Sequence, residues 1–272
     1  MPDRLLLSRY RLSTFAACRR RFQLRYLQRL AWPAAPRALP LQMALERGEA
    51  FHRLVERYYL GLPPFAEDAG IPDEKLSLWW RAFRQSGPEM PAGKRLTEYT
   101  LTVPIGPHFL TGRFDLLVLT GDGAHIFDWK TEARPRTAAV LRDDLQTLLY
   151  LAMVTEGATA LGADGPINPD HVRITYWYAT DPAASVTLGY SRRQHAENWA
   201  NLSAQVTALA AQIEATEAVW PLTDNLQECA ICAFRAYCGR QQVVPLAATR
   251  AAAEDLEPEE DAASPQLEPD VE

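Results

Sequence analysis

The hydrophobic pattern of the chain changes from helical to strand-like near residue 96, and this change most constrains its fold. Residues 96–105 and 109–120 are rich in β-branched and aromatic side chains with strand-like spacing. The Gly-Asp-Gly stretch at 121–123 then predicts a hairpin turn into a third strand at 124–131. Three antiparallel strands between helical segments predict an α/β domain built around a mixed sheet.

Helical patterns lie on both sides of these strands. The first begins near Ser13, a residue type that caps helices, and its apolar residues recur at helical spacing. We expect helices at 12–30, 41–60, 73–83, 137–156 and 192–217, and further strands at 171–180 and 185–190.

The length of 272 residues and the hydrophobic fraction of 47% allow one large domain. Arginines interrupt the N-terminus before any apolar core of a secretory signal develops. No stretch approaches the 18 or more apolar residues of a membrane span. We therefore expect a soluble, cytoplasmic protein that does not enter a membrane.

The net charge of −6 conceals an uneven distribution. Residues 251–272 hold nine acidic residues, three prolines and no basic residue, so we predict a disordered acidic tail at 246–272 after a folded domain at 1–245. Without 251–272 the chain has 25 acidic and 28 basic residues, and eight arginines fall in the first 30 positions. This clustering suits a phosphate-backbone partner, although arginines also cover amphipathic helices without binding one.

One pair of charges interrupts the third predicted strand. Asp128 and Lys130 would project from one face and Trp129 from the other, and the hairpin would bring Asp115 onto the face of Asp128. Facing carboxylates favour a bound Mg²⁺ or Mn²⁺, and a nearby ammonium can orient a water nucleophile. The chain uses lysine only at 75, 94 and 130, so a lysine at 130 favours catalysis. A solvated surface pair is the alternative.

Two helical patterns could extend this site. His52 follows Gly48 by one helical turn, and a neutral imidazole can complete a metal shell. Gln146 and Tyr150 lie four residues apart, on one face of the helix after the third strand. Both can bind a phosphate or a base, although a tyrosine at this spacing is also common in a core.

Four cysteines have a spacing that is typical of a metal centre. Cys229, Cys232 and Cys238 form C-x₂-C-x₅-C, and Cys18 lies about 210 residues upstream. Disulfides are disfavoured in a cytoplasmic chain, so four thiolates suit a structural zinc ion or an iron–sulfur cluster. Either centre would tie the first helix to the end of the folded chain.

The motifs GEAFH, GRFD, FDWKT and QTLLY, in this order, resemble the RecB-like branch of the PD-(D/E)XK nuclease superfamily. The cysteine pattern resembles that of its AddB-like and CRISPR-associated exonuclease members. The likeness extends over about residues 7–240, and one departure is Arg19, where proline is common. It implies a restriction-endonuclease-like core whose termini are tied together by a [4Fe–4S] cluster.

The resemblance also implies a role for each matching residue. The cation, Mg²⁺ or Mn²⁺, would be held by His52, Asp115, Asp128 and the backbone carbonyl of Trp129. Asp115, Asp128, Lys130, Gln146 and Tyr150 would be catalytic. DNA would be contacted by Arg19, Arg20, Arg21, Arg113, Gln146 and Tyr150.

We therefore expect a metal-dependent deoxyribonuclease that acts on single-stranded DNA or DNA ends, in DNA repair, recombination or CRISPR adaptation. The alternative is a non-catalytic DNA-binding or scaffold subunit of a helicase–nuclease or CRISPR integration complex. The sequence contains no G-x₄-G-K-[ST] phosphate loop, so any helicase activity would come from a partner. A third possibility is a zinc-stabilised domain whose acidic tail binds other proteins.

Overall fold

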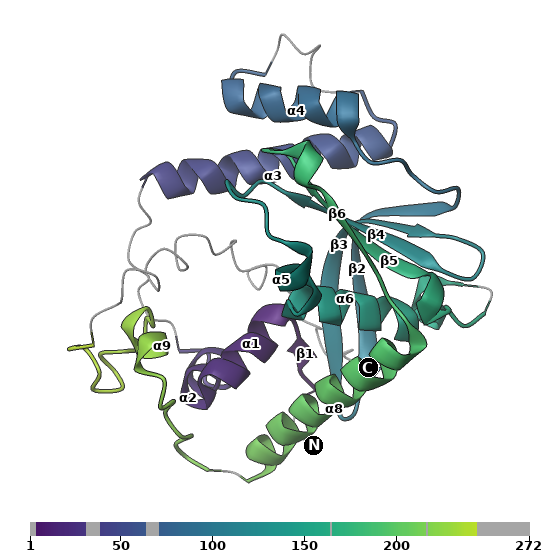
Figure 1. The fold of residues 1–272 in the computed structure, drawn as a ribbon. Coiled ribbons are helices and arrows are strands. Elements are labelled where there is room, and N and C mark those ends of the chain that lie inside the picture. Colours follow the sequence, from purple (N-terminus) through teal and green to yellow (C-terminus); the bar gives the residue numbers. More distant parts are fainter. Residues whose placement is uncertain (1–3, 31–38, 64–70, 164, 216, 244–272) are drawn as a thin grey trace, which may run out of the picture. The chain divides into compact units, whose positions relative to one another are not determined.

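A computed structural model describes residues 4–30, 39–63, 71–163, 165–215 and 217–243 (Figure 1). The predicted acidic tail at 246–272 lies outside the described residues. The chain packs as two compact units. The larger unit comprises Met1–Arg9 and Arg37–Ala218, and the smaller one comprises Tyr10–Pro36 and Val219–Glu272.

The larger unit is built on a mixed sheet, as the sequence predicts, and this sheet has six strands. β2 runs antiparallel along one edge of β3. The other edge of β3 pairs with β1 at one end and with β4 at the other, and the sheet continues from β4 through β5 to β6. β4 and β5 are parallel, whereas β3–β4 and β5–β6 are antiparallel. The strands are β1 (Leu6–Leu7), β2 (Lys94–Ile105), β3 (His108–Leu119), β4 (Ala124–Lys130), β5 (Val172–Tyr178) and β6 (Val186–Gly189).

Helices cover both faces of this sheet. On one face, α3 (Leu39–Tyr59) and α4 (Glu74–Ser86) lie together (Figure 1) and enclose an aromatic core. In that core Trp129 of β4 stacks on Tyr59 and contacts Phe83 edge-on. The opposite face is covered by α6 (Leu145–Glu156), which packs against β5, β2 and β3 and against α8 (Arg192–Glu214). Burial of each large aromatic side chain contributes roughly 2–3 kcal/mol to stability.

Two predicted helices are interrupted, in both cases at a capping residue. The helix expected at 12–30 is divided into α1 (Arg9–Ala17), α2 (Arg19–Phe22) and a π-helical turn, η1 (Gln23–Leu27). Cys18 is extended and its sulfur accepts from the Arg21 amide, so it caps α2, whereas Ser13 caps nothing. The helix expected at 137–156 is divided into α5 (Ala138–Arg142) and α6, because the Asp144 carboxylate caps α6. The two-residue strand β1 was not predicted.

The smaller unit brings the first helices together with residues near the end of the described chain. Trp220 stacks on Phe22 and contacts Phe15 edge-on, and its backbone N–H donates to Gln23. The helix α9 (Leu226–Ala230) follows, and Asn225 caps it. The remaining short elements, all in the larger unit, are α7 (Ala158–Leu161), η3 (Pro169–His171) and η4 (Pro182–Ala184). None of the described helices is long and apolar enough to cross a membrane.

Candidate active site

One edge of β3 is left open where two neighbouring strands part. β1 pairs with Phe109 and Leu110, and β4 pairs with Leu116 to Leu119. Among the described strands, none pairs with this edge between residues 111 and 115. In place of a strand bond, the Trp129 N–H of β4 donates to the Asp115 carboxylate at 2.7 Å. The gap therefore lies beside Asp115, at the point where β3 and β4 diverge.

The strand register aligns three carboxylates across the sheet. In the pairing of β2 with β3, Thr97 is opposite Leu116 and Tyr99 is opposite Phe114, so Glu98 faces Asp115. The pairing of β3 with β4 ends with Leu116 opposite Phe127, and Asp115 and Asp128 are the next residues on the two strands. Like charges directly opposite each other destabilise a sheet. A row of three carboxylates therefore requires cations around it.

At one end of this row the charges are paired with neighbouring side chains. The Lys130 ammonium is 2.9 Å from Asp128 Oδ2, and the exposed fraction of the lysine side chain is only 2%. Gln146, in the first turn of α6, donates to Asp128 Oδ1 at 2.8 Å and accepts from Lys130 at 3.3 Å. The same amide oxygen accepts from Arg9 at 3.1 Å. The pair is thus buried and held by an amide, unlike a solvated surface pair.

At the other end of the row, His52 of α3 lies close to Asp115 and Glu98. His52 Nδ1 is 3.3 Å from Asp115 Oδ1. Burial lowers the pKa of His52, but Asp115, Glu98 and Asp128 outweigh burial and raise that pKa to about 9. Burial and the charge of Asp115 raise the pKa of Glu98 to about 7. The positive charge of protonated His52 therefore offsets carboxylate charge that a bound metal cation would also offset.

Gly48 lies one turn before His52 on α3 and permits a close contact. A side chain at this position would place its Cβ 3.0 Å from Thr131 Oγ1, just beyond β4. The glycine therefore lets α3 approach the end of β4, and this brings His52 to the row of carboxylates.

Tyr150 lies one turn after Gln146 on α6 and is buried, with 5% of the residue exposed. Its hydroxyl donates to the Arg113 carbonyl at 2.5 Å, on the open edge of β3, and its ring packs on Phe114. A Cβ on Gly112 would come within 2.9 Å of this ring. Tyr150 therefore supports the strand that carries Asp115, and this bond occupies its hydroxyl in the structure.

Sequence reasoning missed Glu98. Its backbone adopts a left-handed conformation, with φ at 47°, which is strained for a residue other than glycine. Its carboxylate oxygen Oε2 is 2.7 Å from Nε of Arg113, a predicted DNA-binding residue that is half exposed. The signal that would have revealed Glu98 is the two-residue turn at Gly106-Pro107, which sets Glu98 opposite Asp115.

The four cysteines lie together in the smaller unit. Cys18, Cys229, Cys232 and Cys238 are all free thiols and line one small cavity. Burial and the neighbouring thiols raise the pKa of Cys232 and of Cys238. This convergence of sulfur donors fits a four-thiolate centre, because a bound metal would offset the charge that raises these pKa values.

Hydrogen-bond donors surround these sulfurs. The Arg21 amide donates to the sulfur of Cys18 at 3.4 Å, and Arg240 Nη1 donates to that of Cys229 at 3.2 Å. Donors that point at thiolate sulfur stabilise its negative charge and tune a metal held there.

Three arginines predicted to bind DNA have different environments. Arg19 is exposed, with its guanidinium over the ring of Phe15. Arg20 is buried and donates to Gln23, so its guanidinium is used within the smaller unit. Arg21 forms an ion pair with Glu228 at 3.1 Å. Of these three, Arg19 is the one whose side chain is exposed to solvent.

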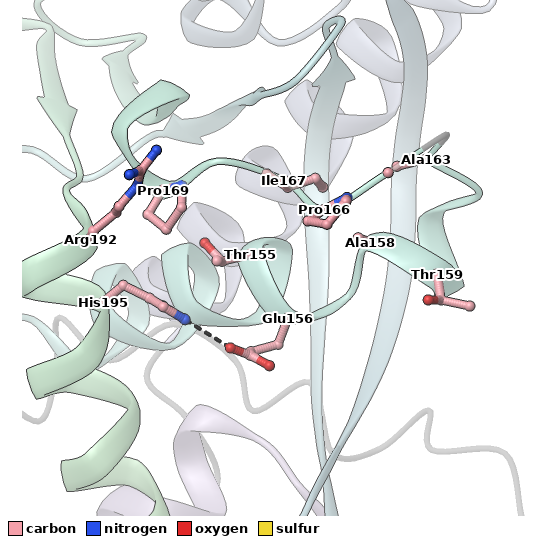
Figure 2. A pocket seen from close by; sticks show the side chains of 11 residues that line it. Thr155, Glu156, Ala158, Thr159, Ala163, Pro166, Ile167, Pro169, Arg192 and His195 are labelled. Carbon is pink, nitrogen blue, oxygen red and sulfur yellow. Dashed lines mark hydrogen bonds and ion pairs between the residues drawn. The ribbon is translucent and has the colours of Figure 1, made fainter.

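A cavity of about 720 Å³ lies at the far end of α6 from Gln146, between α6, α7 and α8 (Figure 2). His195 and Glu156 line it and are joined at 2.8 Å. Arg192, also in its wall, is paired with Asp170 at 3.3 Å. These charged groups already have partners within the fold, and the cavity is separate from the row of carboxylates.

The chain was also compared with models of known protein families. Residues 6–239 match the family model for the PD-(D/E)XK nuclease superfamily. The chain belongs to this superfamily. PD-(D/E)XK nucleases use divalent metal ions, and in this member His52, Glu98 and Asp115 each offer a ligand atom, all within 4.8 Å of one another. This set of one imidazole and two carboxylates fits a divalent metal ion.

One solved structure supports the fold of this PD-(D/E)XK protein, and a second has a lower structural similarity. A crystal structure from Eubacterium rectale named "Putative exonuclease" is 11% identical, covers 91% of this chain and 93% of its own, and has a TM-score of 0.52. The structure of SSO0001 is 12% identical, covers 88% of this chain and 87% of its own, and has a TM-score of 0.36. No curated protein matches the chain at a significant level.

Proposed function

We propose that this PD-(D/E)XK protein is a deoxyribonuclease that uses Mg²⁺ or Mn²⁺ to hydrolyse phosphodiester bonds in single-stranded DNA or at DNA ends. The observation that carries the proposal is the buried Asp128–Lys130–Gln146 network beside His52 and Asp115. A buried lysine is costly unless it is paired, so its retention beside a row of carboxylates supports a catalytic role.

The proposed metal ligands are His52, Asp115, Asp128 and the Trp129 carbonyl. A divalent cation bound there would polarise the scissile phosphate and lower the pKa of a water. Lys130 would hold the attacking water and offset charge that develops on the phosphate. Gln146 fixes the Lys130 ammonium and the Asp128 carboxylate relative to each other, since its amide contacts both.

The proposed DNA contacts are made by exposed arginines. Arg113 and Arg19 have exposed side chains, and both carry charge that a phosphate backbone would attract. Arg20, Arg21, Gln146 and Tyr150 would support these contacts from buried or paired positions.

The experiment is cleavage of end-labelled single-stranded and duplex DNA with Mn²⁺. We expect the wild type to cut, and Asp128→Ala and Lys130→Ala to lose cleavage by on the order of a hundredfold or more. Lys94→Ala is the matched control, because Lys94 is exposed at the start of β2. End-labelled products would also reveal polarity and whether cutting starts at ends.

Two outcomes would reject the proposal. An inert wild type would favour the non-catalytic DNA-binding subunit, and equal cutting by Lys130→Ala would remove the catalytic role of the lysine. A helicase-like or integrase-like partner stays a prediction, which copurification from the native host would test.

For the cysteine cluster we propose a [4Fe–4S] cluster held by Cys18, Cys229, Cys232 and Cys238, which would tie the two ends of the folded chain together. The four thiols that line one cavity, with backbone and arginine donors aimed at two of the sulfurs, support it. Protein purified without oxygen should be brown and absorb broadly near about 400 nm, as iron–sulfur thiolate centres do. A colourless protein that contains zinc would reject the iron–sulfur assignment and favour the zinc alternative.

A further inference from the structure

Glu98 occupies a position that the proposed metal ligands do not account for. It is directly opposite Asp115 in the strand register, and 13% of its side chain is exposed. A mostly buried carboxylate that faces another carboxylate is unfavourable unless nearby cations offset the charge.

The two oxygens of Asp128 are engaged by other side chains. Oδ1 accepts from Gln146 at 2.8 Å, and Oδ2 is 2.9 Å from the Lys130 ammonium. The ligand atoms that do converge within 4.8 Å belong instead to His52, Glu98 and Asp115. The β2 side of the row is therefore where the donors are already gathered.

The spacing of these donors suits a hard divalent cation. Octahedral coordination at about 2.1 Å separates neighbouring ligand atoms by about 3 Å and opposite ones by about 4 Å. Ligand atoms within 4.8 Å of each other need only a small closure to reach that geometry. Arg113 engages Oε2 of Glu98 at 2.7 Å, and this contact restricts the orientation of the carboxylate.

We propose that Glu98 is a further direct ligand of the divalent cation, in addition to the ligands proposed above, so that β2 also contributes a carboxylate to the metal site. This inference rests on the proposed metal-dependent nuclease. It assigns Arg113 a positioning role, since its guanidinium is 2.7 Å from one oxygen of Glu98.

The test is Mn²⁺ binding to the full chain, measured by calorimetry and by the electron paramagnetic resonance signal of free Mn²⁺. Glu98→Gln keeps the size of the side chain and an oxygen that can accept from Arg113, but removes the charge. We expect its Mn²⁺ affinity to fall by at least about tenfold. Glu156→Gln is the matched control, because Glu156 lies at the far end of α6.

Melting temperatures separate a ligand from a structural residue. Without metal, Glu98→Gln should melt at or above the wild-type temperature, because a like charge opposite Asp115 is removed. The rise that Mn²⁺ causes in the wild type should shrink in the variant. Wild-type Mn²⁺ affinity in Glu98→Gln, with a lower metal-free melting temperature, would overturn the inference and make Glu98 an anchor for Arg113.

The same measurements distinguish failure of this inference from failure of the proposed function. If Asp128→Asn weakens Mn²⁺ binding and Glu98→Gln does not, the metal site stands with the ligands proposed above and Glu98 is not among them. If the wild type binds no Mn²⁺, the metal-dependent nuclease itself is rejected.

Discussion

The row of carboxylates and the cysteine cluster both gather groups of like charge, but they offset that charge differently. Asp128 has Lys130, Asp115 has His52, and Glu98 has Arg113 within ion-pair distance. Among the cysteines, burial and neighbouring thiols raise the pKa of Cys232 and Cys238, which favours the protonated, metal-free form. The carboxylates thus have cationic side chains beside them, whereas the cysteines avoid like charge by remaining protonated and would need a bound metal only as thiolates.

Chelation with EDTA should produce the largest effect, and it should remove metal from the carboxylate site but not from the cysteine cluster. Hard Mg²⁺ or Mn²⁺ exchanges readily between carboxylates and EDTA, whereas soft thiolates retain zinc or iron tightly. We expect EDTA to abolish DNA cleavage, added Mn²⁺ to restore it, and the circular dichroism spectrum to remain unchanged. Loss of folded structure in EDTA, with activity that Mn²⁺ cannot restore, would contradict the comparison.

Removal of one cysteine should affect structure before chemistry. Cys229→Ser replaces a sulfur that Arg240 contacts, so we expect loss of the bound metal and unfolding of the smaller unit. Elemental analysis and protease sensitivity of 217–243 measure the two effects. The matched control is Ile231→Ser in the same segment, whose side chain is exposed and is not a proposed ligand. A Cys229→Ser protein with full metal content would show that three cysteines suffice.

Gln146→Ala tests whether the hydrogen bonds of Gln146 with Lys130 and Asp128 matter for catalysis. Without the amide, the Lys130 ammonium and the Asp128 carboxylate lose the group that fixes them relative to each other. We expect kcat to fall by about ten- to hundredfold, the range seen for groups that orient a metal site, with little change in KM. Gln194→Ala, on the exposed start of α8, is the control. A change in KM alone would mean that Gln146 binds substrate instead.

Strand register was the part of the fold that sequence patterns predicted best. The turns at 106–107 and 121–123 fix both hairpins, and the register of β3 with β4 ends one residue before Asp115 and Asp128. The same register places Glu98 beside them, but Glu98 belongs to no motif and its left-handed backbone is not encoded by local propensity. The breaks at Cys18 and Asp144 depend on a side-chain cap within an otherwise helical pattern, which periodicity alone does not detect.

Stability in acid depends on the packing of the sheet, apart from both the carboxylate site and the cysteine cluster. His125 on β4 stacks on Phe127 and its Nε2 is 2.7 Å from Thr175. Burial, with a smaller contribution from Arg173, lowers the pKa of His125 from its ordinary 6.5 to about 4. At this position the unfolded chain therefore binds more protons than the fold between these values, so the contribution of His125 to stability is full above pH 6.5 and is lost as the pH drops towards 4.

We expect His125 to account for about 1–2 kcal/mol of that loss, discounted for partial exposure. Urea unfolding of metal-free protein at pH 7 and near pH 4.5 measures it, with His125→Gln losing less stability than the wild type. His171→Gln is the control, since His171 is half exposed beside Asp122. Equal acid losses in all three proteins would place the titrating groups elsewhere, in the carboxylate site itself.

The smallest effect should come from Tyr150, where sequence and structure suggest different roles. The motif places it among catalytic and DNA-binding residues, but its hydroxyl donates to the Arg113 carbonyl at the open edge of β3. We expect Tyr150→Phe to lose about 1 kcal/mol of stability, a fall of about 2–4 °C in melting temperature, because one buried hydrogen bond is removed.

Cleavage by Tyr150→Phe should change by less than about threefold, because Asp115 keeps its bond to the Trp129 amide. Tyr99→Phe, whose hydroxyl donates to Ala160 away from the carboxylates, controls for loss of a tyrosine hydroxyl. Unchanged stability with DNA affinity lowered about tenfold would show that the hydroxyl leaves Arg113 to contact substrate. In that case the open edge of β3 would itself be part of the DNA-binding surface. The carboxylate site would then reach its final arrangement only when the substrate binds.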